Sequence, residues 1–185
     1  MRRGLWMAGA WGVLWLAAGC IQRVPEVRLA EPRPISVLYV VDGAREAGVQ
    51  GPPEELKAAV EAALSRRNLQ VREVQLHPLA AGFGRVRESG KRYAELARQA
   101  GEGELLLLVE LDAEFFSHLQ GRYRWQARAR LSAGKAGAEP AADALGFPVY
   151  VTFDHEQALA VLATAAPTVA DRAGALLDQV LAAAP

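Results

Sequence analysis

Hydrophobic and polar positions alternate most clearly in the middle of the chain, where the pattern predicts a β-hairpin. Residues 105–111 are almost wholly apolar, which is typical of a buried strand. From residue 122 to residue 131, apolar residues alternate with arginine and glutamine, so one face of the returning strand is apolar and the other is polar. Phe115 and Phe116 stand in succession between these segments, and we expect an irregularity such as a β-bulge there.

Three other segments have the pattern of strands. Residues 35–41 form a short apolar run rich in β-branched residues, which indicates a buried strand. Residues 69–76 have a weaker strand pattern. Residues 147–153 alternate strictly, and Pro148 favours either the edge of a sheet or the start of a strand, because proline cannot donate a ladder hydrogen bond.

Helical spacing of apolar residues appears in three segments. Residues 52–67 open with two prolines and two glutamates, which suit the first turn of a helix. Residues 89–100 begin at Ser89, a favourable N-cap, with Tyr93 and Leu96 on the inward face. Residues 154–185 form the last helix, and Pro167 predicts a kink or two abutting helices near Ala166.

The order of these elements predicts an α+β fold: a mixed, mostly antiparallel sheet with three helices packed on one face. Residues 35–185 would form one domain. The layout resembles that of the amino-terminal domain of TolB and of the periplasmic domains of lipoprotein activators of penicillin-binding proteins. This resemblance covers roughly residues 35–183 and is one of element order.

The first twenty residues have the organisation of an export signal. Arg2 and Arg3 precede an uncharged apolar run that ends in small residues. The stretch Leu16-Ala17-Ala18-Gly19-Cys20 resembles the lipobox of bacterial lipoproteins. The resemblance implies removal of residues 1–19 and a covalent lipid on Cys20, with no other cofactor expected. In the alternative reading, residues 4–22 are just long enough to span a bilayer as an uncleaved helix.

The residues around Cys20 indicate where such a lipoprotein would reside. Cys20 is the only cysteine in the chain, so it has no intrachain disulfide partner. Ile21 follows it, whereas an aspartate there is associated with retention at the inner membrane in the lipoproteins that this chain resembles. The resemblance therefore implies the periplasmic face of the outer membrane in preference to the inner membrane. Residues 20–34, with three prolines, are predicted to be an extended tether with a reach of about 40–50 Å.

Charge and glycine spacing exclude two classes of ligand. The chain has 21 basic and 21 acidic residues, and it lacks the basic excess expected of a nucleic-acid-binding protein. The glycines between residues 82 and 90 precede Lys91 but do not have the spacing of a phosphate-binding loop, and Arg92 stands where a serine or threonine would hold magnesium. We therefore expect no nucleic acid and no nucleotide partner.

Four arginines on the predicted returning strand form a candidate binding strip: Arg122, Arg124, Arg128 and Arg130. If the strands pair in the appropriate register, this face coincides with the acidic face of the preceding strand, which carries Glu110, Asp112 and Glu114. In one interpretation the two rows form cross-strand ion pairs on a solvated sheet face. In the other, the arginines bind an anionic envelope polymer or an acidic partner.

No combination of residues indicates catalysis. The three histidines, His77, His118 and His155, lie far apart and lack metal-ligand spacing, and the chain has no Gly-x-Ser-x-Gly motif. We therefore expect no enzyme activity and no metal site. The sequence favours a non-catalytic lipoprotein, held to the membrane by its lipid, that serves as an accessory or docking component of an envelope assembly or secretion machine. A lipoprotein that binds a lipid, glycan or peptide is the alternative.

Overall fold

A five-stranded mixed sheet forms the centre of the molecule, in the order β2-β1-β3-β4-β5. The computed structural model describes residues 25–42, 51–74, 89–119, 122–151 and 155–183. The strands are β1 (Arg33–Val41), β2 (Leu69–Glu73), β3 (Leu105–Leu119), β4 (Arg122–Lys135) and β5 (Ala141–Val151). The helices are α2 (Glu54–Arg66), α4 (Ser89–Gln99), α5 (His155–Thr164) and α6 (Ala166–Ala182).

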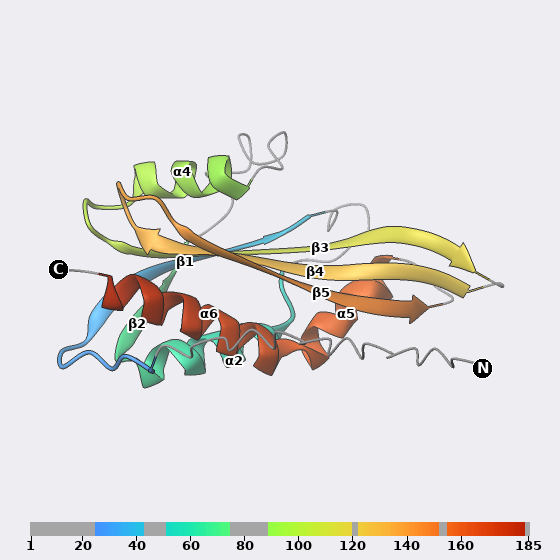
Figure 1. Ribbon diagram of the computed structural model, residues 1–185, viewed down its shortest axis with the longest axis horizontal. Coiled ribbons are helices and arrows are strands. Elements are labelled where there is room, and N and C mark those ends of the chain that lie inside the picture. Colours follow the sequence, from blue (N-terminus) through green and yellow to red (C-terminus); the bar gives the residue numbers. More distant parts are fainter. Residues whose placement is uncertain (1–24, 43–50, 75–88, 120–121, 152–154, 184–185) are drawn as a thin grey trace, which may run out of the picture.

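Strand direction divides the sheet into two parts. β1 pairs in parallel with β2 on one side and with β3 on the other, whereas β3, β4 and β5 form an antiparallel meander. The parallel pairs require crossovers, and the helices α2 and α4 lie in those connections. The α+β class expected from the sequence is therefore confirmed (Figure 1).

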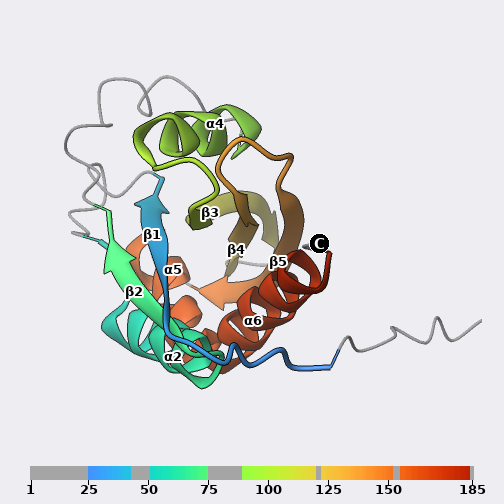
Figure 2. The same ribbon diagram turned by 90° about the vertical axis from the view of Figure 1, so that its left-hand side faces the viewer.

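The helices cover both faces of the sheet, which differs from the expectation of three helices on one face. α2, α5 and α6 lie on one side, and α4 lies alone on the other among the described helices (Figures 1 and 2). The reason is that β1 and β3 are apolar on both faces. Val37 and Leu107 pack with α2 and α6, while Leu38 and Leu106 pack with Tyr93 of α4.

The predicted helix boundaries agree well with the structure. α2 follows Pro53, has two glutamates in its first turn, and ends where Asn68 adopts a φ of 62°. The expected interruption near Ala166 is confirmed, because α5 ends at Thr164 and α6 begins at Ala166 with a proline in its first turn. Two abutting helices thus replace one long one.

The strand boundaries differ more from the expectation. β2 ends at Glu73, and Val74 is not part of it; residues 75 and 76 of the expected strand lie outside the described residues. β5 begins at Ala141, well before residue 147, because small residues allow it to continue the antiparallel pairing with β4. The edge position that Pro148 favoured is confirmed, since β5 is the outermost strand next to β4.

Some of the expected features lie outside the described residues. These are the export signal at residues 1–19 with Cys20, the glycine-containing loop near residues 82–84, His77 and Asp154. Among the helices that the structure describes, none combines the length and the apolar character needed to cross a membrane.

Candidate functional site

The β3–β4 hairpin, which carries the candidate arginine strip, has the register that brings its acidic and basic rows together. Glu110 lies opposite Arg130, and Asp112 lies opposite Arg128. Even-numbered residues therefore pair with even-numbered residues in this part of the hairpin. The register shifts between Phe115 and Ser117, which confirms the predicted irregularity at the two consecutive phenylalanines.

The outer half of this face is a ladder of ion pairs, here called the hairpin ladder, formed by Asp112, Glu114, Arg128 and Arg130. Arg128 Nε donates to Asp112 Oδ1 at 2.8 Å, and Arg128 Nη2 lies 2.8 Å from Glu114 Oε2. Arg130 Nη2 donates to Asp112 Oδ2 at 3.0 Å. The hydrogen bond to Asp112 raises the pKa of Arg128. Both guanidinium groups are thus already engaged by carboxylates.

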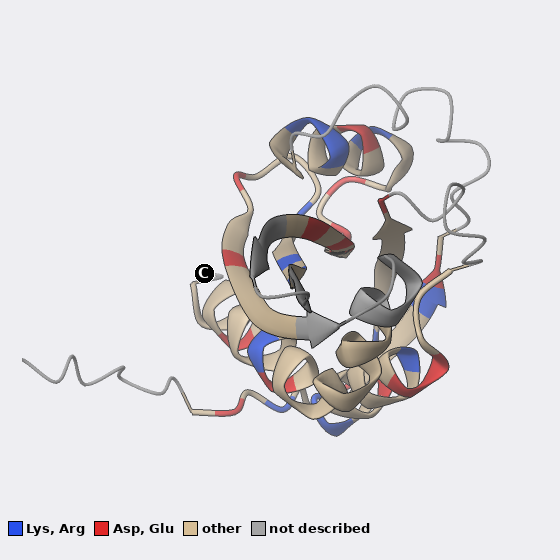
Figure 3. Ribbon diagram, turned by 90° about the vertical axis from the view of Figure 1, so that its right-hand side faces the viewer, with Lys and Arg blue, Asp and Glu red and all other residues tan. Residues whose placement is uncertain are grey.

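The other two arginines of the strip, Arg122 and Arg124, lie in the same strand near the hairpin tip. Their backbones pair with Leu119 and Ser117 of β3, and their side chains lie outside the described part of the chain. Charges of both signs are dispersed over the curled sheet and the helices (Figure 3). Binding of an anionic partner by the strip therefore stays a prediction.

Toward the inner end of the hairpin the ionic face becomes buried beneath α4. Arg92 Nη1 donates to Glu110 Oε1 at 2.6 Å, and only 2% and 1% of these two side chains are exposed. Arg92 also donates to both carboxylate oxygens of Asp42, at 2.9 and 2.7 Å. Desolvation lowers the pKa of Arg92, but its hydrogen bonds to Asp42 and Glu110 outweigh that effect and raise it. Arg92 thus stays charged and ties α4 to β1 and β3.

In the sequence, Arg92 served only to exclude a phosphate-binding loop, and no ion pair was predicted for Arg92 or Asp42, although a signal existed for each. Arg92 precedes Leu96 by four residues, which places it on the buried face of the helix. Asp42 directly follows the buried strand β1. Glu110 was expected to form an ion pair across the hairpin, but it pairs with Arg92 of α4.

Chemically, this arrangement joins secondary-structure elements. Each carboxylate described above is paired with at least one arginine. Across the described ranges, no group of three histidine, cysteine, aspartate or glutamate side chains is placed to hold a metal ion. The geometry supports a structural role for the buried pair Arg92–Glu110.

Near its tip the hairpin carries an aromatic pair. Phe115 and Trp125 lie opposite each other across the strands, with ring centroids 5.5 Å apart and planes at 73°. This edge-to-face geometry is favourable for aromatic rings. The side chain of Phe115 is 47% exposed, the largest such exposure among the big apolar side chains of the described residues. The aromatic pair thus presents apolar surface at the end of a long hairpin.

Comparison with known proteins gives no close relative. No protein-family model matches the chain, and no curated protein matches its sequence. Similar solved structures include rare lipoprotein B from Shewanella oneidensis, with 11% identity over 80% of this chain and 94% of that one and a TM-score of 0.37. A lipoprotein from Neisseria meningitidis has 12% identity over 76% and 99% of the two chains, with a TM-score of 0.40. A minor lipoprotein from Acinetobacter baumannii has 7% identity over 78% and 92%, with a TM-score of 0.39. These values are too low to support an argument about this chain.

Proposed function

We propose that this protein is a lipoprotein of the bacterial envelope, anchored by a lipid on Cys20 and acting as a non-catalytic docking component of an envelope assembly or secretion machine. The observation that carries the proposal is the stretch Leu16-Ala17-Ala18-Gly19-Cys20, which ends an apolar signal at the chain's only cysteine. The absence of an aspartate after Cys20 supports the outer membrane as its location. A folded α+β domain follows within the next fifteen residues.

The docking part of the proposal is supported by the two ends of the hairpin. Its inner end is fixed by the buried pair Arg92–Glu110 and the helix α4. Its outer end presents the exposed ring of Phe115. Exposed aromatic side chains on a rigid support are frequent anchors of protein interfaces. The hairpin tip is therefore the surface on which we expect an envelope protein to dock.

The lipid anchor is tested by metabolic labelling with a radioactive fatty acid. We expect the label on the wild-type protein and its complete loss in Cys20→Ser. An uncleaved anchor helix instead leaves the wild-type chain unlabelled and at its full precursor mass. That result would overturn the lipoprotein assignment.

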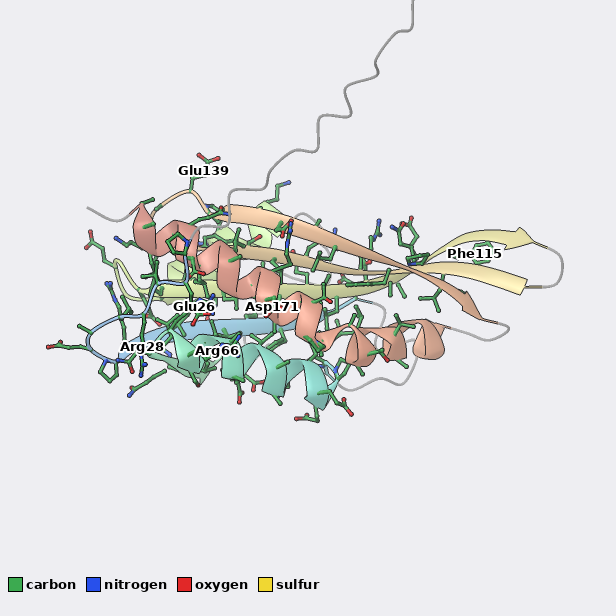
Figure 4. The ribbon with its side chains drawn as sticks, turned by 60° about the horizontal axis from the view of Figure 1, so that its bottom comes forward. Glu26, Arg28, Arg66, Phe115, Glu139 and Asp171 are labelled. Carbon is green, nitrogen blue, oxygen red and sulfur yellow. The ribbon has the colours of Figure 1, made fainter. Side chains whose placement is uncertain are left out.

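The docking surface is tested in intact cells with a photoreactive residue in place of Phe115. The matched control carries the same residue in place of Glu139, which is exposed and lies at the other end of the sheet (Figure 4). We expect one envelope protein to be crosslinked from position 115 and not from 139, and the reverse crosslink to recover this chain. Equal yields from the two positions would contradict docking by the hairpin, and a lipid or glycan adduct would favour the ligand-binding alternative.

A further inference from the structure

A second buried ion pair, here called the clamp, joins α2 and α6, two of the three helices on the face of the sheet opposite α4. Arg67, directly after α2, donates from Nε to Asp178 Oδ1 at 2.9 Å and from Nη2 to Asp178 Oδ2 at 2.7 Å. Only 5% of the Arg67 side chain and 3% of the Asp178 side chain are exposed. A Cβ atom added to Gly174 would lie 2.7 Å from the guanidinium group, so the helix α6 packs directly on it.

The clamp also binds the amino-terminal segment of the domain. The backbone N–H of Val27 donates to Asp178 Oδ1 at 2.9 Å, and that of Leu29 donates to the Arg67 carbonyl at 3.1 Å. Asn68 Nδ2 donates to the Leu29 carbonyl at 3.2 Å. We expected residues 20–34 to be a tether and the folded part to begin near residue 35. Val27 and Leu29 are instead hydrogen-bonded to Asp178, Arg67 and Asn68.

The cost of burying two charges indicates that the clamp serves to position the amino-terminal segment of the domain. Burying two charges carries a large desolvation cost, and a well-packed apolar pair commonly holds two helices together as well or better. An apolar pair would, however, leave the N–H of Val27 without an acceptor. The carboxylate of Asp178 serves both partners at once, because its Oδ1 accepts from Arg67 and from Val27.

The consequence concerns the length of chain between the membrane and the domain. The seven residue steps from Cys20 to Val27 span at most about 25 Å when fully extended. Without the hydrogen bond from Val27 to Asp178, the free segment would extend to Leu29, which is held by the Arg67 carbonyl and Asn68, and would reach about 32 Å. The clamp thus removes about a fifth of the reach of the tether.

We propose that Arg67 and Asp178 hold the tether short, so that the clamp end of the domain lies next to the lipid surface and the tip of the β3–β4 hairpin points away from it. This inference rests on the proposed lipidation of Cys20. Figure 4 shows Glu26, Arg28, Arg66 and Asp171 gathered near the clamp, while Phe115 lies toward the other end of the long axis. The proposed docking surface is thereby directed away from the membrane.

The inference is tested with the full-length protein purified from membranes and reconstituted into vesicles of phosphatidylethanolamine and phosphatidylglycerol that carry an acceptor dye on a lipid headgroup. A donor dye is attached to a cysteine introduced at Asp171 or at Phe115, because a lipidated Cys20 has no free thiol. We expect energy transfer to be severalfold more efficient from position 171 than from position 115. Equal transfer from the two positions would overturn the proposed orientation.

Two variants separate the clamp from the fold. Val27→Pro removes the N–H that Asp178 accepts and leaves Arg67 and Asp178 in place. Arg67→Met with Asp178→Leu replaces the ion pair by apolar residues of similar volume. In both we expect transfer from position 171 to fall measurably, because the free segment lengthens to Leu29, whose bonds to the Arg67 carbonyl and to Asn68 remain. The matched control Arg66→Ala removes only the exposed partner of Asp171 and Glu26 and is expected to leave transfer unchanged.

The failure of this inference is distinguishable from the failure of the proposed function. If mass spectrometry of the reconstituted protein finds no lipid on Cys20, the proposed function is wrong, whether the protein stays out of the vesicles or inserts through an uncleaved helix. If the protein incorporates but Val27→Pro leaves energy transfer at position 171 unchanged, the lipoprotein assignment stands and the clamp inference is wrong.

Discussion

Two carboxylates four residues apart in β3, Glu110 and Glu114, form the same kind of ion pair in very different surroundings. The pair of Glu110 with Arg92 is almost fully buried beneath α4. Nearer the hairpin tip, Arg128 and Glu114 of the hairpin ladder are 36% and 59% exposed. Water screens the exposed pair and replaces either partner if one is lost, whereas nothing replaces a partner inside the protein. The same residue types therefore have a large structural effect at the buried site and a small one at the exposed site.

Removing one partner of the buried pair should have the largest effect on stability. We expect Arg92→Met to lower the free energy of unfolding by about 3–5 kcal/mol, because it leaves the carboxylate of Glu110 buried without its cation. Urea denaturation measures the change. The control is Arg98→Met in the same helix, because Arg98 pairs with Glu95 at an exposed position. This substitution should change the free energy of unfolding by no more than about 1 kcal/mol. Equal losses of unfolding free energy in Arg92→Met and Arg98→Met would contradict this difference between buried and exposed ion pairs.

The clamp offers a second test of how tightly a buried ion pair is packed. Gly174→Ala should destabilise the protein by about 1–3 kcal/mol, because the new methyl group meets the guanidinium of Arg67. The matched change Gly90→Ala lies in α4, where an added Cβ meets nothing within 4 Å. It should instead stabilise the protein by about 0.5–1 kcal/mol, as expected for glycine replaced in a helix. The midpoint temperatures of thermal unfolding of Gly174→Ala and Gly90→Ala should therefore shift in opposite directions from that of the wild type.

The hairpin ladder should respond weakly to the same kind of change. We expect Arg128→Ala to change the free energy of unfolding by no more than about 1 kcal/mol, since its partners Asp112 and Glu114 gain access to water. The effect should also shrink as salt concentration rises. A loss of unfolding free energy as large as that of Arg92→Met would show that solvent exposure does not determine how much an ion pair on this face stabilises the protein.

A half-exposed pair between β5 and α6 should have the smallest effect and a defined pH dependence. The hydrogen bond from Arg172 lowers the pKa of Asp143 below its ordinary value of 3.8. The pair therefore stabilises the folded state above pH 3.8 and loses its contribution as pH falls through the lowered pKa. Arg172→Ala should cost less than about 1 kcal/mol at pH 7. The difference from wild type should disappear in strongly acidic buffer, and a difference that grows with acid would contradict this assignment.

Local patterns in the sequence predicted the hairpin and the helix boundaries well. Strict alternation fixes which residues share a face, so the possible coincidence of the acidic and arginine faces and the irregularity at Phe115-Phe116 were predictable from period and charge, whereas the pairing of Asp112 with Arg128 came from the structure. Pro167 likewise located the break between α5 and α6, because a proline suits the first turn of a helix and interrupts its interior.

Contacts between distant segments were not predictable in the same way. Amphipathic spacing showed which side of α4 is buried, but not that Tyr93 packs on the second face of the sheet. Arg67 and Asp178 are 111 positions apart, and no local pattern links a helix-terminal arginine to an aspartate in the last helix. The clamp and the attachment of Val27 therefore emerged only from the folded structure.

Mass spectrometry of the mature amino terminus, on protein taken from the membrane fraction, tests the central claim most directly. The account predicts a chain that begins at Cys20 and carries fatty-acyl groups on that residue. An intact Met1, or a mature chain whose Cys20 is an unmodified thiol, would contradict it.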